Sequence, residues 1–416
     1  MEHSLEEVVK AYARPFRSVH TLSPLIDEIG NAKIVLMGEA THGTSDFYTL
    51  RAELSKRLIE EKGFSYIAIE GDWPSSARVN QYIKTANKEE RDIREVLQAF
   101  KRWPTWMWAN QEMAEFIYWL KKHNEQSQTK AGLYGIDIYS LWESMEDLIE
   151  LLTEADPTSK DLELAKLVYS CFEKFNRNPE LYASLNTCKN AVSALVKSLE
   201  ANQDLYKDDQ EKLLNLKANA LLVKNAESYY RNLNKSHEIS WNIRDGHMAE
   251  IINEIRSHGG EQSKIIVWEH NTHIGDARAT DMRKEGMTNV GQLLREQHPS
   301  ETVYAIGFGT YKGTVIAADS WGSPFEEITV PPAQENSWEE VLHRTGPFDK
   351  YILFNDLNRS QFDRWVGHRA IGVVYDPDHE ARGNYVPSKI SKRYDAFVFI
   401  DETRALKPLK IKNPII

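Results

Sequence analysis

The chain has 416 residues, of which 41% are apolar and 27% are charged, as in a globular protein with a large core. Its 51 Lys and Arg against 62 Asp and Glu give a net charge of −11, which disfavours nucleic-acid binding because that needs a basic face. Two cysteines give neither a disulfide framework nor a zinc-finger spacing, and no apolar stretch is long enough for a signal peptide or a membrane span. We therefore expect a cytoplasmic protein without a nucleic-acid or membrane partner.

In chain order, helical spacing of apolar residues predicts a helical lead-in over residues 1–30. An apolar run at about 33–38 predicts a strand, and the helix after it is expected to end at Gly63. A second strand is predicted at 66–70, and a third ends at Asp137. Each run has the length and apolar content of a buried parallel strand.

Residues 142–257 show no strand pattern and predict a helical insertion or cap. Further strands are predicted at 264–268, 303–308, 370–375 and 396–400. This alternation predicts an α/β fold with a mostly parallel central sheet flanked by helices, over a single unit of residues 1–416. The basic segment from Lys407 to Pro414 is expected to be a surface extension.

The predicted strands end in acids and imidazoles. Those side chains are Glu39, His42, Glu70, His270 and His273. Ligands of open α/β sheets bind outside the carboxyl ends of the strands, so these residues are expected to converge on one site.

His42 lies on a loop between Gly38 and Gly43, and its imidazole is suited to taking a proton from water. Glu39 could orient that ring, although a helix-capping loop with a surface histidine is the alternative. Arg51, about two turns into the next helix, could pair with an acid or stabilise an oxyanion; a surface salt bridge is its alternative.

His270 and His273 could bind a metal, polarise a carbonyl or protonate a leaving group, and they are not part of an H-E-x-x-H motif. Substrate contacts are assigned to Trp106 and Arg278. Asp72 and Asp137 are interpreted as structural, as is the helical pair of Arg244 and Asp245. The sequence contains no G-x-S-x-G elbow, P-loop or helix-opening G-x-G-x-x-G.

Several segments resemble the erythromycin esterase family. They are Gly38–Gly43 (GEATHG) with Arg51, Ile69–Glu70, Gly135–Asp137, Trp241–Asp245 with His247–Met248, His270–Ile274 and Tyr394–Thr403. The resemblance implies hydrolysis of an ester or lactone, without a cofactor or a required metal. It implies that His42 is the general base, Glu39 and Glu70 are its acidic partners, and Arg51, His270 and His273 position substrate and stabilise charge.

Ala40-Thr41 stands where macrolide-inactivating members of that family carry Asn-Ser. The Ala-Thr form resembles a wider branch that is sometimes labelled for succinoglycan biosynthesis. The expected partner is a small ester or lactone, macrolide-like or another cyclic ester. The alternatives are a metal-dependent hydrolase with the same Glu and His cluster, and a catalytically silent binding or polysaccharide-biosynthesis accessory protein.

Overall fold

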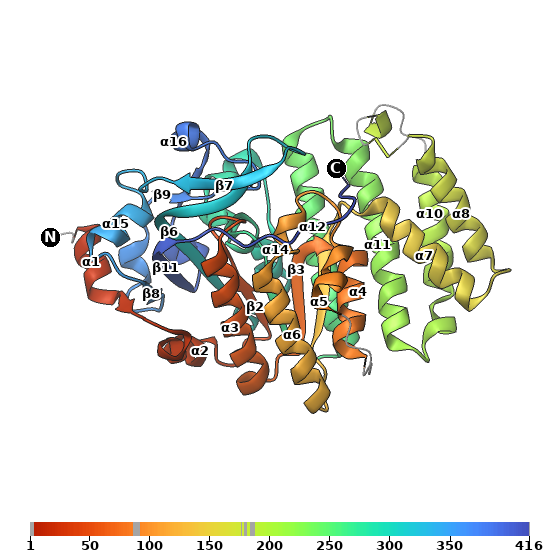
Figure 1. Cartoon of the computed structure of the whole chain (residues 1–416), viewed down its shortest axis with the longest axis horizontal. Coiled ribbons are helices and arrows are strands. Elements are labelled where there is room, and N and C mark those ends of the chain that lie inside the picture. The colour runs from red at the N-terminus through yellow and green to blue at the C-terminus, as the bar shows by residue number, and fades with distance from the viewer. Residues whose placement is uncertain (1–3, 86–91, 176, 179–180, 184–187, 416) are drawn as a thin grey trace.

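A computed structural model describes residues 4–85, 92–175, 177–178, 181–183 and 188–415. Its described residues form a central sheet of nine strands (Figure 1). In spatial order these are β1 (Arg14–Pro15), β8 (Lys350–Leu353), β11 (Ala396–Thr403), β6 (Val303–Ala318), β2 (Ile34–Met37), β5 (Ile265–Trp268), β3 (Tyr66–Asp72) and β4 (Gly132–Asp137), while β7 (Phe325–Val330) pairs with β6.

The sheet is parallel from β11 through β4, and antiparallel only where β8, β1 and β7 join it. The predicted α/β class with a mostly parallel sheet is therefore confirmed. Met37, the last residue of β2, and Ile69 of β3 both pair with Trp268, the last residue of β5, and β3 continues three residues further to Asp72. The residues that follow them must emerge at one edge of the sheet.

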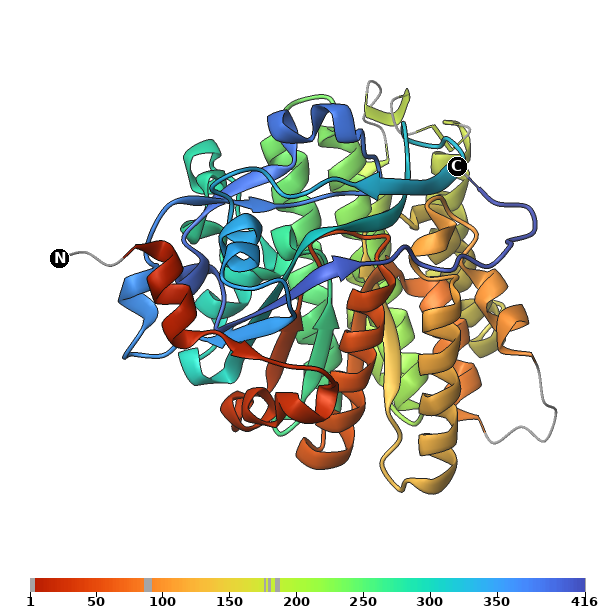
Figure 2. The same ribbon diagram turned by 60° about the vertical axis from the view of Figure 1, so that its left-hand side comes forward.

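Two helical layers cover the sheet because its strand residues alternate between faces. Val35 and Ile67 point into a core that includes α2 (Ser23–Ile29), α3 (Ser45–Lys62) and α6 (Gln111–Gln126). Ile34 and Ala68 point into the opposite core, with α12 (His237–Gly259) and α14 (Val290–Gln297). Figure 2 shows α3 and α6 side by side in front of the sheet.

A group of helices forms one end of the molecule, at the right of Figure 1. It comprises α7 (Leu141–Ala155), α8 (Lys160–Glu173), α10 (Lys189–Ala201) and α11 (Gln210–Asn232). The described residues between β4 and β5 contain no strand. α12 packs against α11 and also against β4, so it connects this helical group to the sheet.

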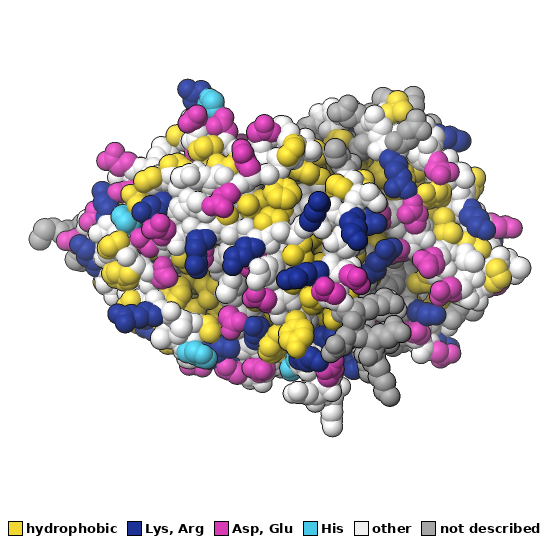
Figure 3. Space-filling view, in the orientation of Figure 1, with side chains coloured by type: hydrophobic (Ala, Val, Ile, Leu, Met, Phe, Trp, Pro, Cys, Tyr) yellow, Lys and Arg dark blue, Asp and Glu magenta, His cyan; other side chains and the backbone are white. Residues whose placement is uncertain are grey.

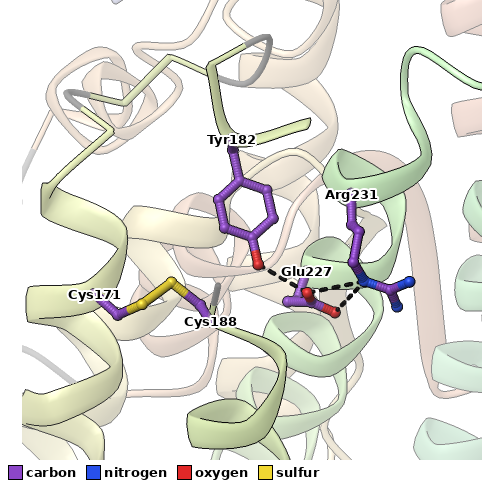
Figure 4. Close-up of a disulfide and its surroundings, with 5 residues drawn as sticks. All are labelled: Cys171, Tyr182, Cys188, Glu227 and Arg231. Atoms are coloured by element: carbon purple, nitrogen blue, oxygen red, sulfur yellow. Dashed lines mark hydrogen bonds and ion pairs between the residues drawn. A yellow bond between two sulfur atoms is a disulfide. The ribbon is translucent and has the colours of Figure 1, made fainter. Parts of the chain in front are cut away.

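Cys171 and Cys188 form a disulfide with an S–S distance of 2.02 Å (Figure 4). The expectation that the two cysteines give no disulfide framework is therefore wrong for this pair. α8 and α10 pack against each other, and this contact brings together two thiols that are 17 residues apart in the chain. A count of two cysteines carries no information about such a contact.

The shorter elements complete the fold. They are α1 (Leu5–Tyr12), α4 (Trp73–Lys84), α5 (Ile93–Val96), α13 (Asn271–Ile274), α15 (Trp338–Arg344), α16 (Glu380–Gly383), α17 (Ile390–Arg393), and a separate hairpin of β9 (Val366–Arg369) with β10 (Tyr385–Ser388). No helix among the described residues is long and apolar enough to cross a membrane. On the face drawn in Figure 3, the described acidic and basic side chains are interspersed.

The strand predicted at 370–375 is wrong. Only isolated bridges occur there, from Ile371 to Thr41 and from Val374 to Ala318. Ile371 and Tyr375 are buried without joining a continuous ladder, whereas Val374 is exposed.

The tail after β11 is held against the molecule and does not extend away from it. The backbone N–H of Leu406 donates to the carbonyl of Gly43, and that of Leu409 donates to the carbonyl of Ala109. Ile415 makes backbone hydrogen bonds with both Lys101 and Trp103. Figures 1 and 2 show this dark-blue segment crossing the molecule toward the orange part of the chain around α5 and α6.

Candidate active site

A cavity of about 440 Å³ opens at the edge of the sheet where the parallel strands end. Its walls include Asp137, which ends a strand, His42, His270 and His273, which follow strands, and Glu70, near the C-terminal end of β3. The side chains that the strand-end argument placed together therefore do line one cavity, with Glu39 directly behind His42.

His42 is oriented by a buried acid. Its Nδ1 lies 2.9 Å from Glu39 Oε1, and Arg51 Nη2 donates to Glu39 Oε2 over 2.8 Å. Glu39 is 1% exposed and Arg51 is completely buried, so neither reaches the cavity. An Nδ1–H that donates to Glu39 leaves His42 Nε2 as the proton acceptor of the ring, the arrangement that a general base needs.

Gly38 and Gly43 are required by close packing at the two ends of the His42 loop. A Cβ on Gly38 would lie 2.0 Å from Asn271 Oδ1, and one on Gly43 would lie 1.9 Å from the carbonyl oxygen of Ile316. Any side chain at either position would displace the loop that carries Glu39 and His42.

Arg244 of α12 connects two carboxylates at neighbouring strand ends. Its Nε and Nη2 donate to the two oxygens of Asp137 over 2.8 Å each, and Nη2 also donates to Glu70 Oε1 over 2.8 Å. Glu70 Oε2 accepts from the backbone N–H of His270 over 2.9 Å. Burial alone would raise the pKa of Glu70, but the charges of His273, His42 and Arg244 hold that pKa well below its usual value.

His273 lies between two acids. Its Nδ1 is 3.0 Å from both oxygens of Asp245, and its Nε2 is 3.4 Å from Glu70 Oε1. Burial opposes the charged ring, yet Asp245 and Glu70 raise the pKa of His273 to about 10. Trp241 stacks on the ring with its centroid 4.7 Å away. His273 is thus a fixed positive charge in the cavity wall at neutral pH.

His270 has the opposite character. Its Nδ1 accepts from the hydroxyl and the backbone N–H of Thr272, and its Nε2 lies 3.2 Å from the carbonyl oxygen of Ala40. Burial and the neighbouring His42 lower the pKa of His270 well below its usual value. The neutral ring lies 4.8 Å from the ring of His42, so it positions that ring without competing for its proton.

Glu269, at the end of β5, is completely buried and neither carboxyl oxygen has a hydrogen-bond partner among the described residues. Burial raises its pKa well above the usual value. Burial therefore favours the protonated form of Glu269, which lies next to a charged cluster.

The described residues contain no group of three or more His, Cys, Asp or Glu side chains with the geometry of a metal site. The ring nitrogens of His270 already bond protein groups, and His273 is held between acids. This arrangement does not fit the metal-dependent alternative, since a ligating histidine needs a free lone pair.

Trp106 and Arg278 do not reach the cavity. Trp106 is completely buried in the core between the sheet and α6, while Trp103 and Trp108 line the cavity. Arg278 pairs with Asp276 and Glu296 at the surface. These positions do not support the substrate-binding roles predicted for both residues.

The sequence analysis undervalued Asp137, Arg244 and Asp245, which hold Glu70 and His273 in place. Asp137 carried the same strand-end signal as Glu70. Arg244 and Asp245 sit on a helix, and nothing in their local sequence separates them from an ordinary helical ion pair.

Comparison with known proteins shows the family of the chain. The erythromycin esterase family matches residues 59–403, and the chain belongs to that family. Erythromycin esterase type II of Escherichia coli is 21% identical over 388 residues, covering 85% of this chain and 89% of that protein.

Two solved structures share the fold. A Bacillus cereus protein superimposes with a TM-score of 0.80 at 21% identity, covering 97% of this chain and 98% of that chain. A structure named as a succinoglycan biosynthesis protein superimposes with a TM-score of 0.77 at 21% identity, covering 97% of each chain.

Proposed function

We propose that this protein hydrolyses a carboxylic ester or lactone by direct attack of a water molecule that His42 activates. The observation that supports this most strongly is the buried series Arg51–Glu39–His42, which ends at the cavity with Nε2 of His42 as its proton acceptor. Membership of the erythromycin esterase family supports the same class of reaction.

In the first step, His42 Nε2 takes a proton from water as the water oxygen bonds to the carbonyl carbon. The carbonyl oxygen takes up the electron pair and becomes an oxyanion. Glu39 stabilises the imidazolium that forms, because its carboxylate faces Nδ1. We assign stabilisation of the oxyanion to the positive charges of His273 and Arg244, both of which line the cavity.

In the second step, the oxyanion collapses and the bond to the alcohol oxygen breaks. His42 returns its proton to that oxygen, which releases an alcohol and a carboxylic acid. A lactone would give one open-chain hydroxy acid by the same two steps.

The test is hydrolysis of a panel of aryl esters, lactones and erythromycin by the wild type and by His42→Ala. Loss of a general base is expected to lower kcat by about 10²–10⁴-fold. His20→Ala, which removes an exposed histidine, serves as the control and should keep full activity. Equal turnover by His42→Ala and the wild type would overturn the assignment.

The two alternatives give different results on the same panel. A metal-dependent hydrolase would lose its activity after chelation and recover it on addition of zinc or manganese. A silent accessory protein would hydrolyse no member of the panel in a manner that depends on His42.

A further inference from the structure

Three aromatic rings from distant segments meet in one wall of the cavity. Trp103 precedes α6, Tyr139 follows β4, and Trp321 lies in the turn between β6 and β7. The ring of Trp321 has its centroid 4.6 Å from that of Trp103 and 6.3 Å from that of Tyr139. We call these three residues the aromatic rim.

Trp321 is unusually open to solvent for so large an apolar side chain. It is 60% exposed, whereas Trp103 is 8% exposed. The turn that carries Trp321 is fixed in place, because Nε1 of Trp103 donates to the carbonyl oxygen of Ser323 over 2.9 Å. A large apolar surface that is exposed and held at a cavity wall is typical of a ligand-binding site.

Arg244 contacts both the aromatic rim and Glu70, which lines the cavity together with His42. The guanidinium of Arg244 lies 5.0 Å from the centroid of the Tyr139 ring, and the same guanidinium binds Glu70. A substrate that binds the aromatic rim with one part can therefore place another part against the side of the cavity that Glu70 and His42 line.

Charge in the cavity wall decides what kind of group the rim can take. Arg102 is paired with Asp72 over 2.8 Å and also with Glu143, and Arg244 is paired with Asp137 and Glu70. His273, the third cation of the described wall, lies between Asp245 and Glu70. An anionic group of the substrate on the rim would thus meet aromatic faces and cations that already pair with carboxylates, and those cations are assigned only to the oxyanion of the proposed reaction; an uncharged ring would meet the aromatic faces alone.

We propose that the aromatic rim is a subsite for an uncharged, ring-shaped apolar group of the substrate, and that Trp321 determines this specificity. The inference rests on the proposed function only in naming that group as one side of an ester. Binding covers the exposed face of Trp321, and stacking on this ring stabilises the bound group.

The experiment measures binding calorimetrically with 2-naphthol, an uncharged product of an aryl ester, so that it does not depend on turnover. Trp321→Ala is expected to weaken binding by about tenfold, because the stacking ring is lost. Trp321→Phe keeps a ring and should retain most of the affinity. Trp365→Ala removes a tryptophan that is 44% exposed outside the cavity wall and should bind like the wild type.

The anion 2-naphthoate has the same rings and tests the charge argument, with binding expected to be at least tenfold weaker than that of 2-naphthol. Equal affinity of the wild type and Trp321→Ala for 2-naphthol, or no binding to the wild type, would overturn the subsite. Equal affinity for naphthoate and naphthol would overturn its preference for uncharged groups. Binding that depends on Trp321 without hydrolysis of any member of the panel would keep the subsite and reject the esterase function.

Discussion

At the scale of single residues, the site depends on one guanidinium. Arg244 contacts both oxygens of Asp137 and one oxygen of Glu70, a geometry that needs the planar fork of arginine. The side chain of lysine has the same charge but only one nitrogen, so it cannot make these three hydrogen bonds to the carboxylates of Asp137 and Glu70 in the same geometry.

Arg244→Lys is therefore expected to lower kcat by about 10–100-fold, since small displacements of reacting groups cost rates of this size. Steady-state kinetics on the ester that the wild type turns over fastest measures the effect. Arg278→Lys is the matched control, because Arg278 contacts Asp276 in the same forked manner outside the cavity. Similar kcat values for the two variants would contradict the role given to Arg244.

The raised pKa of the buried Glu269 can be tested through the pH dependence of folding stability. Its pKa is raised in the folded protein by burial, so folding takes up a proton at any pH between the unfolded and folded pKa values. The wild type should lose stability in that window relative to Glu269→Gln, which is neutral at every pH.

In urea unfolding, the free energy of unfolding of Glu269→Gln should therefore rise relative to that of the wild type by about 1.4 kcal/mol for each pH unit above roughly 4.5, within that window. Near pH 4 this gain should vanish, because the acid is then protonated in both states. Glu335→Gln, at an exposed position, controls for the loss of a carboxylate. A pH-independent difference between Glu269→Gln and the wild type would show that Glu269 is ionised.

At the scale of elements, the sequence predicted the six parallel strands of the sheet and missed the strands that join it antiparallel. β2 and β5 are uninterrupted apolar runs, and both occur where the pattern placed them. β7 is largely exposed, and its alternation is too weak to recognise without its partner β6. A strand was wrongly predicted at 370–375 because the segment is apolar and partly buried, yet it forms only isolated bridges.

The same distinction explains how much of the site was predictable. Glu39, His42, Glu70, His270 and His273 follow strands, and strand ends can be located from the sequence. Arg244 and Asp245 reach the site only because α12 lies against the sheet, and Trp321 only because a hairpin turns over the cavity. The positions of these three residues depend on packing between elements, which the spacing of residues along the sequence does not reveal.

The disulfide joins α8 to α10 within the helical group, away from the residues that line the cavity. Closing a loop of this length contributes about 3 kcal/mol in the chain-entropy account. Replacing both cysteines by serine should lower the free energy of unfolding by about that amount and leave kcat unchanged.

Denaturant unfolding with and without reductant measures this effect, and wild type in reductant should behave like the double variant. Two free thiols titrated in the oxidised wild type would contradict the pairing of Cys171 with Cys188.

At the scale of the whole molecule, the cavity wall is held from the far end of the chain. The N–H of Trp103 donates to the carbonyl oxygen of Ile415 over 2.7 Å, and the N–H of Ile415 donates to that of Lys101 over 2.7 Å. Residues more than 300 positions apart thus fix the segment that carries one ring of the aromatic rim.

Ending the chain at Lys410 removes both bonds and keeps those made by Leu406 and Leu409. We expect KM for aryl esters to rise several-fold, because the Trp103 segment loses its anchor, with little change in kcat. Lys412→Ala, at an exposed position of the same tail, should leave KM unchanged. An unaltered KM in the truncated chain would show that the Trp103 segment is held without the tail.

The tail also has a consequence for how the protein is made. β11 lies between β6 and β8 in the sheet, and the residues after it hold the Trp103 segment. During synthesis, the cavity wall therefore cannot be completed until residue 415 has left the ribosome. A nascent chain that already contains every proposed catalytic residue but not residue 415 would still lack the backbone bonds that hold the Trp103 segment of the cavity wall.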